Sequence, residues 1–199
     1  MVALFNTDYW PMVYISLNEF KFDDQTFEEY QILYLNLLLK CKKRNEKIVL
    51  ITNLTNINNV DQLPLNYIMK QMQFNKKIYD FNKKYIRCVC ILCKNKGIKN
   101  ILNTFFSISK PAAPFKLFRS IEKINNYLLD NFNLEFDINK YESNFDISKY
   151  QNNLVNDLEE ESSDNNDQIK NITNEIINNN TDNSYNKKEF NDYFNELSL

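Results

Sequence analysis

The stretch that decides the fold reads Tyr85-Ile-Arg-Cys-Val-Cys-Ile-Leu-Cys93. Its run from Ile86 to Cys93 is short, almost wholly apolar and rich in β-branched residues, which favours a β-strand. The apolar residues do not alternate with polar ones, so we expect a strand covered on both faces, as in the middle of a parallel sheet. An amphipathic run from Lys96 to Ser109 and an apolar run from Phe115 to Phe118 follow. Together these segments predict one strand–helix–strand unit.

A second buried strand is predicted on the N-terminal side, from Lys47 to Thr52. Before it, residues 23–44 carry apolar side chains at steps of three and four behind capping residues, which predicts a helix. Two short apolar runs, residues 2–5 and 12–17, follow one another around Pro11 and predict an antiparallel hairpin at a sheet edge. Further helices are expected over residues 64–84, 96–109 and 120–132. The predicted fold is α/β, with a mostly parallel central sheet, an antiparallel N-terminal edge hairpin and about four helices.

The charge of the chain changes sign after residue 132. Residues 1–132 hold 19 Lys and Arg against 11 Asp and Glu, whereas residues 133–199 hold 5 against 15, and 17 of those 67 residues are Asn. Such a composition buries too little apolar surface to offset the entropy of ordering it. We therefore expect a folded domain over 1–132 and a disordered, acidic, Asn-rich tail over 133–199. The tail charge predicts an intramolecular contact with the basic body, and whether the segment Phe190–Leu197 folds is left open.

The composition excludes several kinds of site. One Gly in 199 residues cannot build a Gly-rich phosphate loop, and the absence of His removes the usual general base and the commonest metal ligand. We expect no catalytic residue, no cofactor and no metal. The pair Cys90-Ile-Leu-Cys93 is open to a metal or redox interpretation, but its apolar strand and the lack of a second ligand pair favour buried thiols.

We also expect no signal peptide and no transmembrane segment. It starts without a basic stretch followed by an apolar run, and no apolar run approaches the roughly 20 residues that span a bilayer. The expected compartment is therefore the cytoplasm, with the nucleus as the alternative.

Three stretches resemble the STAS-like domains, the anti-sigma-factor antagonist type and their stand-alone relatives. They are Trp10-Pro-Met-Val-Tyr-Ile leading into Phe22-Asp-Asp-Gln-Thr-Phe-Glu-Glu-Tyr30, Lys47-Ile-Val-Leu-Ile-Thr-Asn-Leu-Thr55, and Pro114-Phe-Lys-Leu-Phe-Arg-Ser-Ile-Glu122. They are similar to the family's second strand and first helix, its central strand and turn, and its last strand with the capped helix that follows. The resemblance covers residues 1 to about 132 and implies a non-catalytic regulatory module that binds another protein.

One departure from that family concerns its regulatory serine. In phosphorylatable members, a Ser near an Asp opens the second helix and switches partner binding. The matching stretch here is Ile57-Asn-Asn-Val-Asp-Gln-Leu63, which has no Ser, and Asn53 stands where an acidic residue is common. The resemblance therefore implies a module without the phospho-switch.

The candidate site follows from the predicted sheet, because open parallel sheets bind ligands beyond the carboxyl ends of their strands. That edge would collect Asn53, Thr55, Asn56, Asp61, Lys94 and Asn95. The leading hypothesis is a module that presents the loop over residues 53–63 to an unknown protein partner. The alternative is a domain that binds a small ligand, a nucleotide or a lipid head group. Electrostatic binding to a membrane or to nucleic acid is a third option, with nucleic acid disfavoured because no aromatic residues interleave the basic ones.

Overall fold

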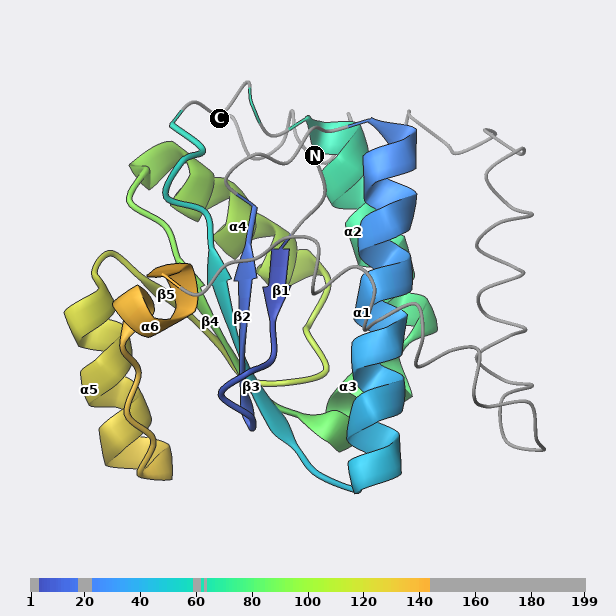
Figure 1. Cartoon of the computed structure of the whole chain (residues 1–199). Helices are drawn as coiled ribbons and strands as arrows, with labels where there is room; N and C mark the ends of the chain where they lie inside the picture. The colour runs from blue at the N-terminus through green and yellow to red at the C-terminus, as the bar shows by residue number, and fades with distance from the viewer. Residues whose placement is uncertain (1–3, 18–22, 59–61, 63, 144–199) are drawn as a thin grey trace. The chain divides into compact units, whose positions relative to one another are not determined.

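The computed structural model describes residues 4–17, 23–58, 62 and 64–143, which form five strands and six helices (Figure 1). In chain order they are β1 (Leu4–Asn6), β2 (Met12–Ser16), α1 (Asp24–Arg44), β3 (Ile48–Asn53), α2 (Leu65–Lys77), α3 (Tyr79–Tyr85), β4 (Ile86–Leu92), α4 (Lys96–Ile108), β5 (Phe115–Phe118), α5 (Ile121–Phe132) and α6 (Ile138–Ser143). The predicted α/β class is confirmed. None of the described helices is both long and apolar enough to cross a membrane.

The five strands form one sheet in the order of the chain, β1-β2-β3-β4-β5. β1 runs antiparallel to β2, with Leu4 opposite Ser16, and the other three pairs are parallel. β3 and β4 are direct neighbours, with Ile51 opposite Cys90. The predicted edge hairpin and the predicted pairing of the two most apolar segments are therefore both confirmed.

This sequential order decides where the helices lie. Crossovers between parallel strands are right-handed, so steps to the next strand in one direction put α1, α2, α3 and α4 on the same face of the sheet. Ring contacts agree, because Phe115 of β5 packs on Phe106 of α4, whereas Phe118, on the other side of the same strand, packs on Tyr127 of α5. Figure 1 shows α5 and α6 on the side of the sheet away from α1, α2 and α3.

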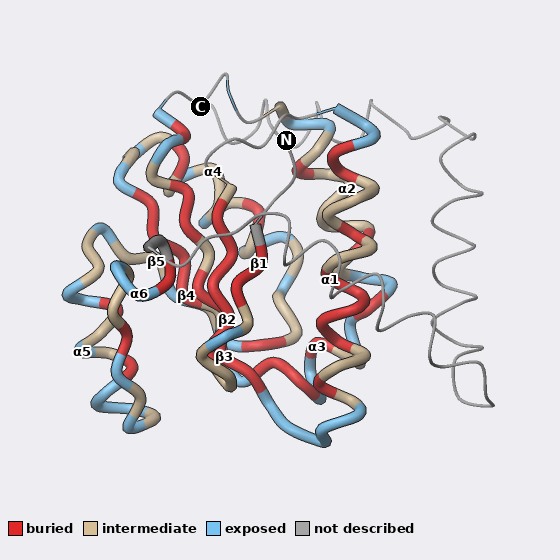
Figure 2. The backbone as a smooth tube through the Cα atoms, in the orientation of Figure 1, coloured by how far each residue is buried: buried red, intermediate tan, exposed pale blue. Residues whose placement is uncertain are grey.

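Because both faces are covered, β2, β3 and most of β4 are buried, as the red parts of the sheet in Figure 2 show, whereas β5 at the sheet edge is only partly buried. Side chains alternate between the faces. Val13, Ile15 and Leu50 point toward α1 to α4, whereas Tyr14 and Ile51 belong to the cluster packed against α5. This two-sided burial is the reason for the unbroken apolar runs in the sequence.

The segment expected to be one helix over residues 64–84 is two helices. Ile78 separates α2 from α3 with φ −100° and ψ 18°, and its side chain is fully buried. The break places Asn82 where its Oδ1 accepts a hydrogen bond from the Tyr34 hydroxyl at 3.1 Å. Neither Gly nor Pro stands at this point, so composition carries no sign of the break. With α6, it raises the number of described helices from the four expected to six.

The chain folds back after α5. Asn133 adopts the left-handed conformation, with φ 54° and ψ 40°, which Asn tolerates better than most non-Gly residues. Its N–H donates to the carbonyl of Leu129 at 3.1 Å, and the N–H of Leu134 donates to the carbonyl of Leu128 at 3.3 Å. This reversal returns the following residues to the face of the sheet that α5 covers.

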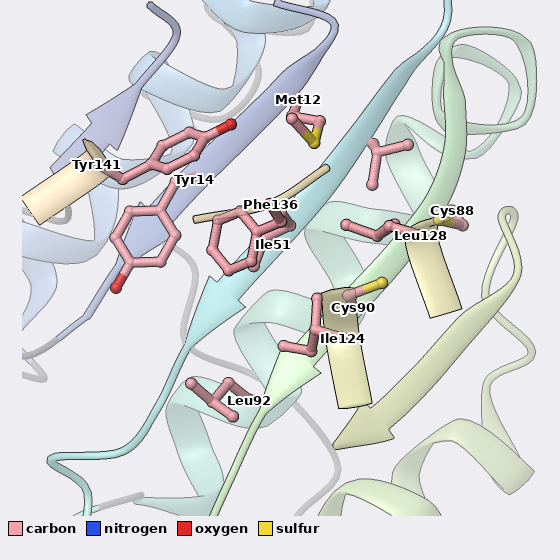
Figure 3. Close-up of a cluster of buried hydrophobic side chains, with 11 residues drawn as sticks. Met12, Tyr14, Ile51, Cys88, Cys90, Leu92, Ile124, Leu128, Phe136 and Tyr141 are labelled. Atoms are coloured by element: carbon pink, nitrogen blue, oxygen red, sulfur yellow. The ribbon is translucent and has the colours of Figure 1, made fainter. Parts of the chain in front are cut away.

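The returning segment completes the core on that face. Phe136 and Tyr141 are 3% and 1% exposed, and their ring centroids are 5.0 Å apart. Figure 3 shows both residues with Tyr14 and with Ile124 of α5. The buried members of this α5-side cluster are Met12, Tyr14, Val49, Ile51, Cys88, Cys90, Leu92, Ile124, Leu128, Phe136 and Tyr141.

The folded part of the chain, which was expected to end at Phe132, therefore continues to Ser143, the last residue of α6. The physical reason is the bare second face of the sheet, which α5 alone leaves partly open to Phe136 and Tyr141. Residues 144–199 lie outside the described residues. That range includes Phe190–Leu197 and most of the acidic charge expected to contact the basic body, so those expectations stay predictions.

Candidate functional site

The carboxyl ends of β3, β4 and β5 meet at one edge of the sheet, where a hollow of about 370 Å³ opens beside the start of α5. Its lining comes from these strand ends, from the residues at the start of α5 and from α6. The lining residues are Asn53, Thr55, Leu92, Lys94, Arg119, Ser120, Ile121 and Ile138. Polar side chains from three strand ends therefore share one hollow with an apolar wall.

Asn53 ends β3 and connects the sheet to the loop that follows. The residue is 2% exposed, its Nδ2 donates to the Tyr14 hydroxyl at 2.7 Å, and its Oδ1 accepts the N–H of Thr55 at 2.9 Å. The amide is thus suited to a position where it must both donate and accept.

Residues 54–58, the part of the loop directly after β3 that the structure describes, are hydrogen-bonded at both of their ends. The N–H of Leu54 donates to the carbonyl of Leu92 at 2.9 Å, and Nδ2 of Asn95 donates to the carbonyl of Asn58 at 2.6 Å. The other side-chain atom of Asn95, Oδ1, caps α4. Asn56 and Asn58 nevertheless have exposed side chains. Residues 54–58 therefore combine a hydrogen-bonded backbone with an accessible polar surface.

Two cations stand at the hollow, Lys94 beyond the end of β4 and Arg119 directly after β5. Ser120 caps α5 with its hydroxyl, so the positive end of the α5 dipole also lies at the hollow. Glu122, in the first turn of α5, is exposed and is not among the lining residues. The polar side of the hollow is therefore positively charged.

The structure divides the six residues expected at this edge. Those that line the hollow are Asn53, Thr55 and Lys94. Asn56 is exposed on the neighbouring loop, and both amide atoms of Asn95 are used to hold that loop and to cap α4. Asp61 lies outside the described residues.

Sequence reasoning missed Arg119, Ser120 and the apolar wall of the hollow. The strand-end rule that selected Lys94 applies equally to β5, and it would have found Arg119. Ile138 carried no such signal, because it lies in the segment expected to be a disordered tail. The hollow is therefore more cationic, and more enclosed by apolar side chains, than the sequence suggested.

The four cysteines are unpaired and buried. Burial raises the pKa of Cys41 to about 12 and also raises the pKa of Cys93 above its ordinary value. Protonated thiols are poor nucleophiles and poor metal ligands, which applies here to Cys41 and Cys93. Cys90 points into the α5-side cluster, whereas Sγ of Cys93 donates to the carbonyl of Asn95 at 3.4 Å. Across the described part of the chain, no group of three or more His, Cys, Asp or Glu residues is placed to hold a metal ion.

Comparison of the chain with protein-family models, with curated proteins and with solved structures yields no match in any of the three. The resemblance to STAS-like domains therefore rests on the residues quoted in the sequence analysis.

Proposed function

We propose that this protein is a non-catalytic, STAS-like interaction module that presents the loop after β3 and the neighbouring starts of α4 and α5 to a protein partner. The observation that supports the proposal is the set of hydrogen bonds that hold the backbone of that loop. The backbone of its described residues, 54–58, is hydrogen-bonded to β4 through Leu54 and to the start of α4 through Asn95. A surface that is already ordered loses little entropy when a partner binds, which favours affinity.

The side chains at this edge support recognition better than chemistry. They are amides, hydroxyls and cations, such as Asn53, Thr55 and Lys94. A general base or a nucleophile needs a pKa matched to proton transfer and a group that activates it. Both polar side-chain atoms of Asn53 instead form structural hydrogen bonds. The proposed site therefore binds and orients a partner, and the reduced, buried thiols suit a cytoplasmic protein.

The test replaces exposed loop side chains in the full-length protein and measures which partners are captured. Asn56→Arg and Asn58→Arg place a bulky charge on the loop without touching its backbone bonds. Asn126→Arg, on the exposed side of α5, is the matched control. We expect cross-linked partners from an extract of the source cells to be lost with both loop variants and kept with the control. Capture of the same proteins by all three variants would contradict the proposal.

A second candidate function, binding of a small anionic ligand, is favoured by one observation. The hollow beside the loop contains Lys94 and Arg119, and its volume of about 370 Å³ falls in the range of small-molecule sites.

A further inference from the structure

The lining of the strand-end hollow is divided into two parts. The polar part is formed by Asn53, Thr55, Lys94, Arg119 and Ser120. The apolar part is formed by Leu92, Ile121 and Ile138. A ligand that fills the hollow would therefore carry an anionic group on one side and carbon atoms on the other.

The polar part has unbalanced positive charge. Lys94 and Arg119 have no carboxylate at ion-pair distance within the described residues, and no acidic residue is among those that line the hollow. α5 is 12 residues long, and the hydroxyl of Ser120 accepts the N–H of Lys123. The N–H groups of Ile121 and Glu122 belong to the same first turn, whose donors have no partners inside the helix. Two side-chain cations and a helix start thus line the same hollow.

This combination is the one that phosphate groups prefer. Arg binds phosphate oxygens in pairs, Lys adds a point charge, and backbone N–H groups at a helix start bind the remaining oxygen. A phosphate monoester carries close to two negative charges at neutral pH, which matches the two cations. A carboxylate carries one and would leave a cation unbalanced.

The volume indicates that more than a phosphate enters. At the roughly 30 Å³ that a water molecule occupies in the liquid, a five-atom phosphate takes about 150 Å³ at most. The hollow measures about 370 Å³. The remaining space lies against Leu92, Ile121 and Ile138, which suits a compact carbon body.

We propose that the hollow binds a small phosphate monoester, with its phosphate at Lys94, Arg119 and the first turn of α5 and its carbon body against Ile121 and Ile138. This inference rests on the ligand-binding candidate above, and its test is separate from the test of partner capture by the loop. Thr55 belongs both to the lining and to the turn that follows β3. An occupied hollow would therefore alter the surface that the loop presents.

The experiment measures binding of inorganic phosphate and of phenyl phosphate to the full-length protein by calorimetry. Phenyl phosphate is expected to bind at least tenfold more tightly than inorganic phosphate, because it also covers the apolar wall. Arg119→Gln and Lys94→Gln should each weaken both probes at least tenfold. Ile138→Ala should weaken phenyl phosphate and leave inorganic phosphate unchanged, which separates the two parts of the hollow.

The control is Arg87→Gln, an exposed Arg near the start of β4, at the opposite end of the sheet. It should leave both affinities within twofold of the unsubstituted protein. An equal loss with Arg87→Gln and Arg119→Gln, or equal affinity for the two probes, would overturn the proposal in favour of diffuse charge attraction. Asn56→Arg, the loop variant of the partner test, should keep phosphate binding. A failure of partner capture would thus be distinguishable from a failure of ligand binding.

Discussion

The docking of α6 on the sheet can be tested with three single substitutions in the full-length chain. Phe136→Ala and Tyr141→Ala each remove a ring from the α5-side cluster, where both residues are almost completely buried. Tyr141→Phe keeps the ring and removes a hydroxyl that is buried without a hydrogen-bond partner among the described residues. The three variants therefore separate ring packing from the polar atom.

The expected losses are large compared with the stability of a typical domain. Replacing a buried aromatic ring by a methyl group costs about 3 to 5 kcal/mol through lost transfer energy and the cavity left behind. Native domains are stable by only about 5 to 15 kcal/mol. For a chain of this size, each 1 kcal/mol lowers the melting temperature by about 2 to 4 °C, so each alanine variant should melt roughly 6 to 20 °C lower. Tyr141→Phe should be neutral or stabilise by up to about 1 kcal/mol, since an unpaired buried hydroxyl is unfavourable.

Urea unfolding followed by far-UV circular dichroism measures these differences, with coincident fluorescence transitions as the check for two-state behaviour. The double alanine variant should lose less than the sum of its parts, because the two ring centroids are 5.0 Å apart. The reasoning is refuted if both alanine variants unfold within about 0.5 kcal/mol of the unsubstituted protein, the range of surface substitutions. The folded body would then end near Phe132, as the composition alone suggests.

Three further predictions test the backbone, the site and the thiols. Asn133→Gly should stabilise the protein by about 0.5 to 1 kcal/mol and Asn133→Ala should destabilise it by about 1 kcal/mol, because Asn133 has a φ of 54°; urea unfolding that ranks Ala above Gly would count against this geometry. Asn53→Ala should cost about 1 to 3 kcal/mol, since it leaves the buried Tyr14 hydroxyl without this partner, whereas Asn56→Ala should change the free energy of unfolding by less than about 0.5 kcal/mol. A thiol-reactive dye at pH 8 should label none of the four cysteines before unfolding and all of them in guanidinium chloride, because all four side chains are buried and the dye cannot reach them in the folded protein; rapid labelling of the folded protein would show that the thiols are accessible.

The strands and most helices could be predicted because local chemistry agrees with the global fold. The short, continuous apolar runs at Lys47–Thr52 and Ile86–Cys93 favour strands that are buried on both faces of a sheet. Two helix starts could also be predicted from their capping residues. In the structure, the side chain of Asp23 accepts the N–H of Thr26 and that of Ser120 accepts the N–H of Lys123. At these positions the capping side chain favours a helix start independently of the residues that pack against it.

The end of the folded body could not be read in the same way. Residues 133–143 are polar at most positions, and their average composition resembles a solvated tail. Their order depends on Phe136 and Tyr141, which pack against a surface built by distant parts of the chain. Asn6 illustrates this dependence, because its buried Nδ2 donates to the carbonyl of Tyr141 at 3.3 Å. The average composition of a segment cannot indicate that two of its aromatic side chains pack against a surface formed by distant parts of the chain.

Only part of the candidate site could be predicted from the sequence, for a related reason. The rule about strand ends acts on sequence position, so it selected Asn53 and Lys94 directly. The rule could not predict that both side-chain atoms of Asn95 form structural hydrogen bonds and are therefore not available to a ligand. The apolar wall includes Ile138 of α6. Because the sequence did not predict that α6 packs on the sheet, it did not predict this wall either.

That shared dependence links the stability of the fold to the proposed site. Ile138 and Tyr141 are three residues apart in α6, a spacing that places both side chains on one side of a helix. Tyr141 enters the core, while Ile138 packs against the same cluster and also lines the hollow. A ligand that contacts Ile138 would bind the docked form of α6 better than the undocked form. By mass action it would then stabilise the core that Tyr141 completes, so Tyr141→Ala should weaken phenyl phosphate binding from a residue outside the hollow.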